Sequence, residues 1–258
     1  MSRYYDFFCP VRLMAGEQAL EQLPDELMAL GARRPLLLTD KGVGGSGLAT
    51  LLANVLAEGG LPVAAIWDQI PADSSTAVVE RIATRWRELG CDSLVALGGG
   101  SVIDTAKAVN ILVTLGGERL LDHAGAGCLT RPLKPLAVVP TTAGTGSEVT
   151  LVAVIRDEGS GRKVPFTSPF LLPQLAVLDP RLTRGLPLPI TAATAMDAMT
   201  HAIEAFIGNA KNPVSDALAL MAVEKIADAL PKVLQAPEDK HLRLQLAEGS
   251  TLAGMAFS

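Results

Sequence analysis

An aspartate and a histidine stand four residues apart in the stretch AMDAMTHAIEA, residues 195–205. Residues at positions i and i+4 lie on one face of a helix, so Asp197 and His201 can direct a carboxylate oxygen and an imidazole nitrogen at one ion. Such donors suit Fe(II), Zn(II) or Mn(II). An ordinary contact within the helix explains the same spacing, so the pair alone leaves both interpretations open.

A run of three glycines marks a second candidate site, in the stretch ALGGGSVIDTAKA. It joins the end of a predicted strand to the start of a predicted helix, where backbone N–H groups can approach an anion at the positive helix end. The residues concerned are Gly98, Gly99, Gly100 and Ser101. The alternative is a tight turn in which Ser101 caps the helix and Asp104 completes a capping box. A cap and a phosphate site occupy the same helix end, so both remain open.

Hydroxyl side chains follow another predicted strand, in the stretch VVPTTAGTGSEVT. Together with open glycine backbone, they suit hydrogen bonding to ribose and phosphate oxygens. The alternative is a solvated turn. Five hydroxyl residues with Glu148 as the single charged residue favour a binding site instead. The hydroxyls belong to Thr141, Thr142, Thr145, Ser147 and Thr150.

Asp40 stands at the end of a third predicted strand. An acidic side chain there can accept hydrogen bonds from a ribose diol and repel a 2′-phosphate, which favours NAD over NADP. The alternative is that Asp40 only begins the turn DKGVGGSG. In the usual dinucleotide fingerprint the acid follows the glycine loop, whereas Asp40 precedes the glycine run, so an ordinary Rossmann motif does not fit.

Hydrophobic patterning predicts the elements that must position these residues. Apolar runs at 34–40, 62–68, 92–100 and 134–142 read as strands, and amphipathic stretches at 48–60, 76–90 and 101–116 read as helices between them. The strands are continuously rather than alternately apolar, which indicates a parallel sheet covered on both faces.

The pattern changes near Leu186, where Pro180, Pro187 and Pro189 interrupt the chain. Helical periodicity then predicts helices at 191–208, 213–230 and 239–258. We therefore expect an α/β domain with a parallel, Rossmann-like sheet over residues 1–185. An all-α domain, incomplete here, is expected over 186–258, because the last helix ends in apolar residues without a cap.

Composition narrows the class of partner and the cellular location. A formal net charge of -5 without a dense Lys/Arg run argues against nucleic acid or an anionic membrane. The chain lacks the apolar run of a signal peptide and the roughly 18 apolar residues of a membrane span, so we expect it in the cytoplasm. The odd number of cysteines, 3, without CxxC spacing predicts free thiols.

The stretches GGGSVIDTAK, PTTAGTGSEVT and AMDAMTHAIEA, in this order, closely resemble the iron-containing (group III) alcohol dehydrogenase family. The resemblance implies an N-terminal dinucleotide-binding domain, a C-terminal helical domain and a divalent metal in the cleft between them. It implies that Asp197 and His201 bind the metal. It implies that NAD is contacted by Asp40, Gly98, Gly99, Gly100, Ser101, Asp104, Thr141, Thr142, Ser147, Thr150 and Lys163.

Two features depart from the family pattern. Asp73, in PADSST, stands where many members carry the amide of Pro-Asn-Pro-Thr. In the family two further histidine ligands follow the segment that resembles STLAGMAFS, and neither His123 nor His241 matches a ligand position. We therefore expect either a fragment of a longer protein or a truncated product with half a metal site.

These observations predict an NAD-dependent, metal-dependent alcohol dehydrogenase that interconverts a small alcohol and its aldehyde or ketone. The family metal is Fe(II), with Zn(II) or another divalent ion as alternatives, and it acts as a Lewis acid on the substrate oxygen. Two other functions remain open: a non-catalytic nucleotide-binding remnant, and a related metal-dependent polyol dehydrogenase.

A homodimer formed through the N-terminal domain is expected, because the opening segment SRYYDFFCPVRLMAG is rich in aromatic residues for a chain with only 4% of them. Exposed apolar groups at a strand edge favour partners. The alternative is that these side chains cover the chain's own sheet.

Overall fold

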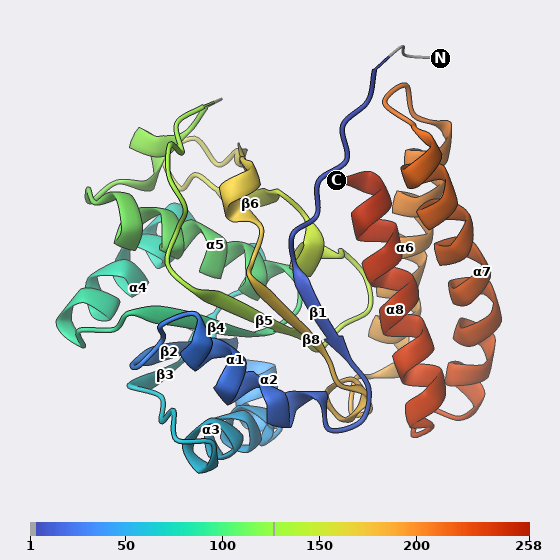
Figure 1. The fold of residues 1–258 in the computed structure, drawn as a ribbon, viewed down its shortest axis with the longest axis horizontal. Coiled ribbons are helices and arrows are strands. Elements are labelled where there is room, and N and C mark those ends of the chain that lie inside the picture. The colour runs from blue at the N-terminus through green and yellow to red at the C-terminus, as the bar shows by residue number, and fades with distance from the viewer. Residues whose placement is uncertain (1–3, 126) are drawn as a thin grey trace.

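The computed structural model describes residues 4–125 and 127–258, so Ser2 and Arg3 of the aromatic opening segment lie outside the described residues. Its centre is a six-stranded sheet in the order β1-β8-β5-β4-β2-β3, and every neighbouring pair of strands is parallel (Figure 1). The strands are β1 (Arg12–Ala15), β2 (Pro35–Asp40), β3 (Ala65–Ile70), β4 (Ser93–Gly98), β5 (Leu136–Pro140) and β8 (Leu175–Leu178).

Burial explains the apolar runs of the central strands. β4, β5 and β8 are buried at every residue, because helices cover both faces of the sheet. One face packs on α1 (Leu23–Ala29) and α3 (Leu48–Glu58), and the other on α4 (Thr76–Glu88) and α5 (Gly100–Leu115) (Figure 1). The predicted parallel α/β sheet is confirmed.

The stretch after β2 is a short helix, α2 (Lys41–Gly45), where a turn was expected. β3 begins at Ala65, three residues later than the predicted start at Pro62. β3 also ends at Ile70, two residues beyond the predicted end, so the strand is displaced along the chain, and Pro62, which has no backbone N–H for a strand ladder, lies outside it.

An antiparallel hairpin lies outside the main sheet. Its strands are β6 (Val152–Arg156) and β7 (Lys163–Thr167), and Ala153 and Ile155 pack into the same core as α5. The connections between these elements contain short 3₁₀ helices. These are η1 (Ala19–Gln22), η2 (Leu120–His123), η3 (Ser147–Val149), η4 (Pro169–Leu171) and η5 (Pro180–Leu182).

Three long helices follow and pack beside the sheet (Figure 1): α6 (Leu188–Ile207), α7 (Pro213–Gln235) and α8 (Lys240–Phe257). Their shared core is rich in alanine, which lets the helix backbones approach closely. α7 continues through Pro231 and ends five residues beyond the predicted end. Among the described residues, no helix has the length and apolar content needed to cross a bilayer.

Candidate active site

The glycine run joins β4 to α5. α5 begins at Gly100, its N-cap is Gly99, and no side chain caps it. The predicted capping box is therefore wrong, because the helix starts before Ser101. The Ser101 hydroxyl oxygen instead accepts the N–H of Asp73 at 3.3 Å. The first-turn N–H groups of α5 thus have no capping side chain and remain suited to an anion.

The hydroxyl loop, residues 141–150, lies directly against this helix start. The N–H of Thr141 donates to Gly98 O at 3.1 Å. A Cβ added to Gly99 would lie 3.1 Å from Thr142 Oγ1, and one added to Gly100 would lie 2.7 Å from Thr145 Cγ2. Two motifs far apart in the sequence therefore form one cradle, in which the absence of a Cβ at Gly99 and Gly100 lets the Thr142 and Thr145 side chains pack against the start of α5.

Asp104, Ser147 and Thr150, three of the predicted nucleotide contacts, are bonded within the protein behind the hydroxyl loop. Asp104 is half-buried: its Oδ1 accepts the Ser147 hydroxyl at 2.6 Å, and its Oδ2 accepts the N–H of Val154 at 2.9 Å. Burial raises the pKa of the Asp104 carboxyl. Thr150 Oγ1 accepts a hydrogen bond from Lys107 Nζ at 3.2 Å. These side chains shape the cradle, and their direct contact with a nucleotide stays a prediction.

Asp40 ends β2, next to β4 in the sheet, so Asp40 and Gly98 lie at the same edge. The Asp40 side chain caps α2, and its Oδ1 accepts the N–H of Val43 at 2.9 Å. The local role expected as the alternative is therefore present, and the place at the carboxyl edge also suits a ribose.

Lys163 begins β7 and forms an ion pair with Asp73, with Nζ 3.0 Å from Oδ1. Arg156 Nε lies 3.6 Å from the other carboxylate oxygen. Asp73 has a φ of 62°, a left-handed conformation in which aspartate and asparagine are enriched among non-glycine residues. The Asp73 N–H bond to Ser101 places this charge cluster beside the start of α5.

Sequence reasoning missed two buried charges within the quoted motifs. Lys107 is fully buried, and its Nζ donates to Thr150 O at 2.7 Å and Val152 O at 3.0 Å. Desolvation lowers the pKa of Lys107 to about 8 against the opposing effect of Asp104 and Glu148. Glu148 is 4% exposed, accepts the Thr251 hydroxyl at 2.7 Å, and has its pKa raised by burial. The sequence did contain a signal for these buried charges, because charged residues stand inside otherwise apolar, glycine-rich motifs.

Asp197 and His201 share one face of α6, as their spacing predicts. Asp197 Oδ1 lies 3.9 Å from His201 Nε2, a separation that is long for a hydrogen bond and wide enough for both atoms to face one ion. His201 Nδ1 is buried without a hydrogen-bond partner, and the ring centroid is 4.8 Å from that of Phe257. Across residues 4–125 and 127–258, no group of three or more His, Cys, Asp or Glu side chains is placed to hold a metal ion.

The hydroxyl loop also contacts α6 and α8. A Cβ on Gly144 would lie 2.8 Å from Thr194 Cβ, and Thr194 precedes Asp197 by about one helical turn. Gly146, at φ +63°, faces Gly254 so closely that a Cβ on Gly146 would lie 2.5 Å from Gly254 Cα. The cradle and the Asp197–His201 pair are thus held on either side of one glycine-rich loop.

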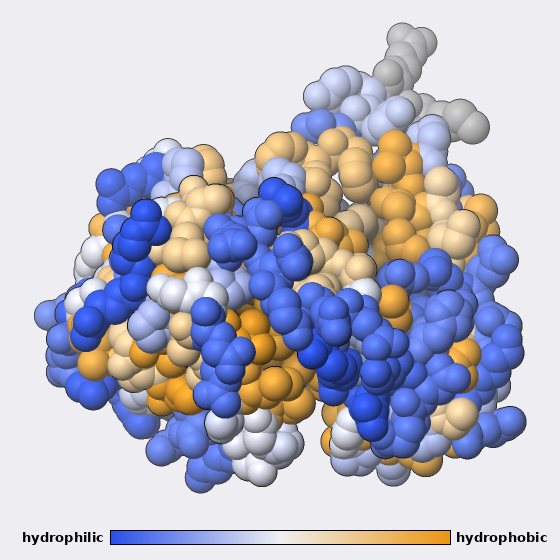
Figure 2. All heavy atoms as spheres, turned by 60° about the horizontal axis from the view of Figure 1, so that its bottom comes forward, coloured by the Kyte–Doolittle hydropathy of each residue, from blue (hydrophilic) through white to orange (hydrophobic). Residues whose placement is uncertain are grey.

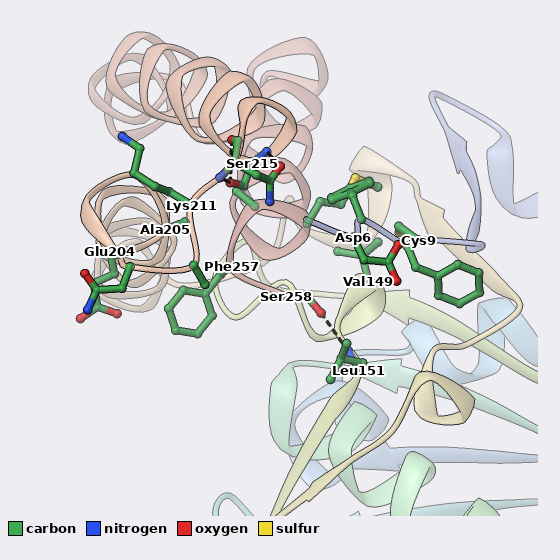
Figure 3. Close-up of a pocket in the computed structure, with 18 of the residues that line it drawn as sticks. Asp6, Cys9, Val149, Leu151, Glu204, Ala205, Lys211, Ser215, Phe257 and Ser258 are labelled. Atoms are coloured by element: carbon green, nitrogen blue, oxygen red, sulfur yellow. Dashed lines mark hydrogen bonds between the residues drawn. The ribbon is translucent and has the colours of Figure 1, made fainter. Parts of the chain in front are cut away.

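A hollow of about 440 Å³ lies between the segment before β1 and the C-terminal ends of α6 and α8 (Figure 3). Figure 3 shows Asp6 and Cys9 on one side and Glu204, Lys211 and Phe257 on the other, and Ser258 Oγ accepts the N–H of Leu151. Of the predicted site residues, none lines this hollow. Val149 of the hydroxyl loop does line it, and Phe257 contacts the His201 ring, so the hollow adjoins the loop and α6 without including a predicted site residue.

The family comparisons cover most of the chain. The model for iron-containing alcohol dehydrogenase matches residues 10–180, and the model for the C-terminal part of the Fe-containing alcohol dehydrogenase family matches residues 191–258.

Three similar proteins illustrate the range of activities among relatives. A 4-hydroxybutyrate dehydrogenase from Cupriavidus necator is 44% identical over 243 residues, which are 93% of this chain and 62% of the relative. A 1,3-propanediol oxidoreductase structure has a TM-score of 0.95 at 37% identity and is 66% covered by this chain. A sulfoacetaldehyde reductase from Bifidobacterium kashiwanohense, solved with NAD+, has a TM-score of 0.90 at 30% identity and is 67% covered. The chain spans about two thirds of the length of these relatives.

Proposed function

Because this chain belongs to the iron-containing alcohol dehydrogenase family, we propose that it serves an NAD-dependent interconversion of a small alcohol and its aldehyde or ketone. The observation that carries the proposal is the meeting of three motifs: the uncapped start of α5, the hydroxyl loop against it, and α6 with Asp197 and His201 on the far side of that loop.

We propose that the cradle binds the pyrophosphate of NAD. The first-turn N–H groups of α5 supply donors and the positive end of the helix dipole. The absence of a Cβ at Gly99 and Gly100 lets Thr142 and Thr145 pack against the helix start, so their hydroxyls lie beside these N–H groups and add hydrogen-bonding groups for phosphate oxygens. The carboxylate of Asp40 would accept hydrogen bonds from a ribose diol and repel a 2′-phosphate. The structure of the relative with NAD+ supports the same cofactor class.

We propose that Asp197 and His201 are metal ligands. His201 Nε2 and the Asp197 carboxylate oxygen that lies 3.9 Å from it supply the donor types that Fe(II) or Zn(II) accepts. A catalytic site needs about three protein ligands, so these two fit only part of a metal site and an ion held firmly here requires further donors. When bound, a divalent ion polarises the oxygen of an alcohol or carbonyl substrate.

The chain's own residues would bind and orient the reactants. The glycine cradle fixes the nucleotide, and the close packing of Gly144 on Thr194 sets the distance between the hydroxyl loop and α6. The relatives named above act on a hydroxy acid, a sulfonated aldehyde and a diol, so we propose a small alcohol or aldehyde without choosing among them.

Calorimetric titration with NAD and NADP tests the cofactor proposal. We expect the 258-residue chain to bind NAD more tightly than NADP, and a failure to bind NAD would contradict the proposal. Metal analysis after dialysis tests the ligand pair. We expect far less than one equivalent of iron or zinc, because two donors do not compensate the desolvation of the ion.

An assay of NADH production with ethanol, 1,3-propanediol and 4-hydroxybutyrate separates the candidate functions. We expect activity near background in the 258-residue chain and turnover in any longer product of the same reading frame that binds metal. Turnover confined to diols would favour a polyol dehydrogenase. NAD binding without metal or turnover in every product would favour the non-catalytic remnant.

We propose a homodimer formed through the segment before β1. Tyr4 is 77% exposed and Phe8 is 59% exposed, which argues against the alternative that these side chains cover the chain's own sheet. Orange apolar surface gathers next to this segment in Figure 2, and β1 is an edge strand of the sheet. Light scattering tests the proposal, and a monomer at micromolar concentration would contradict it.

We also propose a domain boundary between residues 185 and 186 and a cytoplasmic location. The boundary is supported by the separate cores of the sheet and of α6–α8. The location is supported by the thiols of Cys9, Cys91 and Cys128, which are free, since the cytosol keeps cysteines reduced. Limited proteolysis near Leu186 and cell fractionation test the two proposals.

A further inference from the structure

Three ionisable side chains lie beneath the cradle: Asp104, which is half-buried, and Lys107 on α5, and Glu148 on η3. Lys107 is fully buried, and Glu148 is 4% exposed. Asp104 and Lys107 are hydrogen-bonded to the segment 147–154, and Glu148 belongs to it. This segment runs from the end of the hydroxyl loop into β6. Buried charges are costly unless they are paired and hydrogen-bonded, so their partners show what they hold in place.

Lys107 holds the end of the hydroxyl loop. Its Nζ has three acceptors, Thr150 O at 2.7 Å, Thr150 Oγ1 at 3.2 Å and Val152 O at 3.0 Å, which match the three donors of an ammonium group. Since Lys107 and Gly100 lie on α5, these bonds fix the loop relative to the start of that helix.

Glu148 holds the same loop to α8. Its carboxylate accepts the Thr251 hydroxyl at 2.7 Å, and both residues are buried. Beside this bond, Gly146 and Gly254 approach so closely that a Cβ on either would lie less than 3 Å from the other's Cα. The loop therefore has one face on α5 and the opposite face on α8.

We infer that Lys107, Glu148 and Thr251 are positioning residues that couple nucleotide binding at the start of α5 to the order of α8 in the helical region. The inference rests on the proposed NAD site. A nucleotide that orders the hydroxyl loop also favours the state in which Glu148 and Thr251 are bonded. By thermodynamic linkage, a change that lowers the order of α8 also lowers the order of the hydroxyl loop.

Amide hydrogen exchange of the 258-residue chain with and without saturating NAD tests the coupling. In the unmodified chain NAD slows exchange in residues 141–150, and several-fold in residues 246–257, which lie on α8 and include none of the predicted nucleotide contacts. In Thr251→Val, which keeps the shape but removes the hydroxyl, NAD still slows exchange in the loop while the effect on α8 falls below half.

Conservative variants separate the hydrogen bond from general packing. Thr251→Ser keeps a hydroxyl and restores the NAD effect on α8, and Glu148→Gln keeps an acceptor oxygen and retains most of it. The matched control Thr114→Val removes a hydroxyl bonded to Asn110 at the far end of α5 and leaves the effect unchanged. Lys107→Met weakens NAD binding about tenfold by calorimetry, because the loop loses its anchor.

The outcomes distinguish the inference from the function it rests on. If the unmodified chain binds no NAD, the proposed function fails and this inference fails with it. If NAD binds but leaves α8 exchange unchanged, or if Thr251→Val retains the full effect, the coupling alone is overturned. A merely structural role for Thr251 predicts faster exchange in α8 by the same factor with and without NAD.

Discussion

The proposed nucleotide side of the candidate site, at the start of α5, and its proposed metal side, on α6, are built differently. Around the start of α5, Asp104 has protein partners at 2.6 and 2.9 Å, and Lys107 has three acceptors within hydrogen-bond distance. On α6 the Asp197 side chain is 49% exposed and lies 3.9 Å from His201, whose Nδ1 has no partner.

The two sides differ in how far each is organised before a ligand binds. On the nucleotide side, polar side chains that already have hydrogen-bond partners hold the glycine-rich cradle in one shape, so a nucleotide would bind a preformed site. The facing donors on α6 have no bond that fixes them, so their geometry depends on an ion and on further ligands.

The close contact between Gly146 of the hydroxyl loop and Gly254 of α8 gives the largest expected effect on stability. In Gly254→Ala the new Cβ would lie 2.7 Å from Gly146 Cα and 2.8 Å from Gly146 O, and backbone atoms cannot move aside. We expect a loss of about 3 kcal/mol in the free energy of unfolding, measured in denaturant. The control is Gly185→Ala, since a Cβ there meets nothing within 4 Å, and an equal loss in both would contradict the steric explanation.

The buried ammonium group of Lys107, on the nucleotide side, should make the stability of the fold depend on pH. Desolvation lowers the pKa of Lys107 in the folded chain to about 8, from 10.5 for an exposed lysine. The unfolded state therefore binds more protons between these pH values, and stability rises with pH in that window. Relative to Lys107→Met, the unmodified chain should gain about 2 to 3 kcal/mol between pH 8 and pH 10.5. Denaturant unfolding of both proteins across this range measures the difference. A constant difference would mean that the Lys107 pKa is not depressed.

Asp40→Asn tests the charge at the edge of the nucleotide side. An asparagine keeps an oxygen for the Val43 N–H, so α2 retains its cap while the carboxylate charge is removed. We expect NADP to bind about tenfold more tightly, with NAD changed by less than threefold, because repulsion of the 2′-phosphate is lost. Calorimetry with both nucleotides measures this. An unchanged preference would remove Asp40 from the site.

Asp73→Asn tests the charge cluster beside the helix start. The change restores the amide that many family members carry and releases Lys163 and Arg156 from their ion pairs. We expect NAD to bind two- to threefold more tightly, since exposed ion pairs are worth about 0.2 to 1 kcal/mol. The advantage should shrink in 0.5 M salt. Weaker binding would show that Asp73 itself contacts the nucleotide.

Asp197→Asn gives the smallest effect and tests the metal side. The side chain is half exposed and makes no short bond to His201, so we expect the free energy of unfolding to change by less than about 0.5 kcal/mol. Thermal or denaturant unfolding in a chelator measures this without bound metal. A loss above about 1 kcal/mol would favour the ordinary intrahelical contact over a ligand pair.

Sequence patterns predicted the elements whose burial is uniform. β2, β4 and α5 lie within a residue or two of their expected bounds, because a continuous apolar run is what a strand covered on both faces requires. β1 and β8 were not predicted: each has only four residues, and their pairing joins the two ends of the sheet region, which no local window can detect. The hairpin of β6 and β7 was also missed, although its pairing is local, because each strand has only five residues and Pro165 interrupts the second.

The candidate site was predicted in its residue types but not in its bonding. Spacing placed Asp197 and His201 on one face of α6, and the glycine run at the start of α5. Spacing could not tell that Asp104 turns inward to Ser147, or that Asp73 pairs with Lys163, because these contacts depend on how distant segments pack.

The place of β8 between β1 and β5 has a consequence for the order in which the sheet is made. Synthesis begins at the N-terminus, so β1 emerges first, yet its only partner strand in the described sheet, β8, emerges after every other strand. Pairings of such long sequence separation form slowly. The edge strand with its neighbouring aromatic residues therefore stays unpaired on the ribosome until Leu178 has emerged, which makes this edge the part of the nascent chain most in need of protection from aggregation.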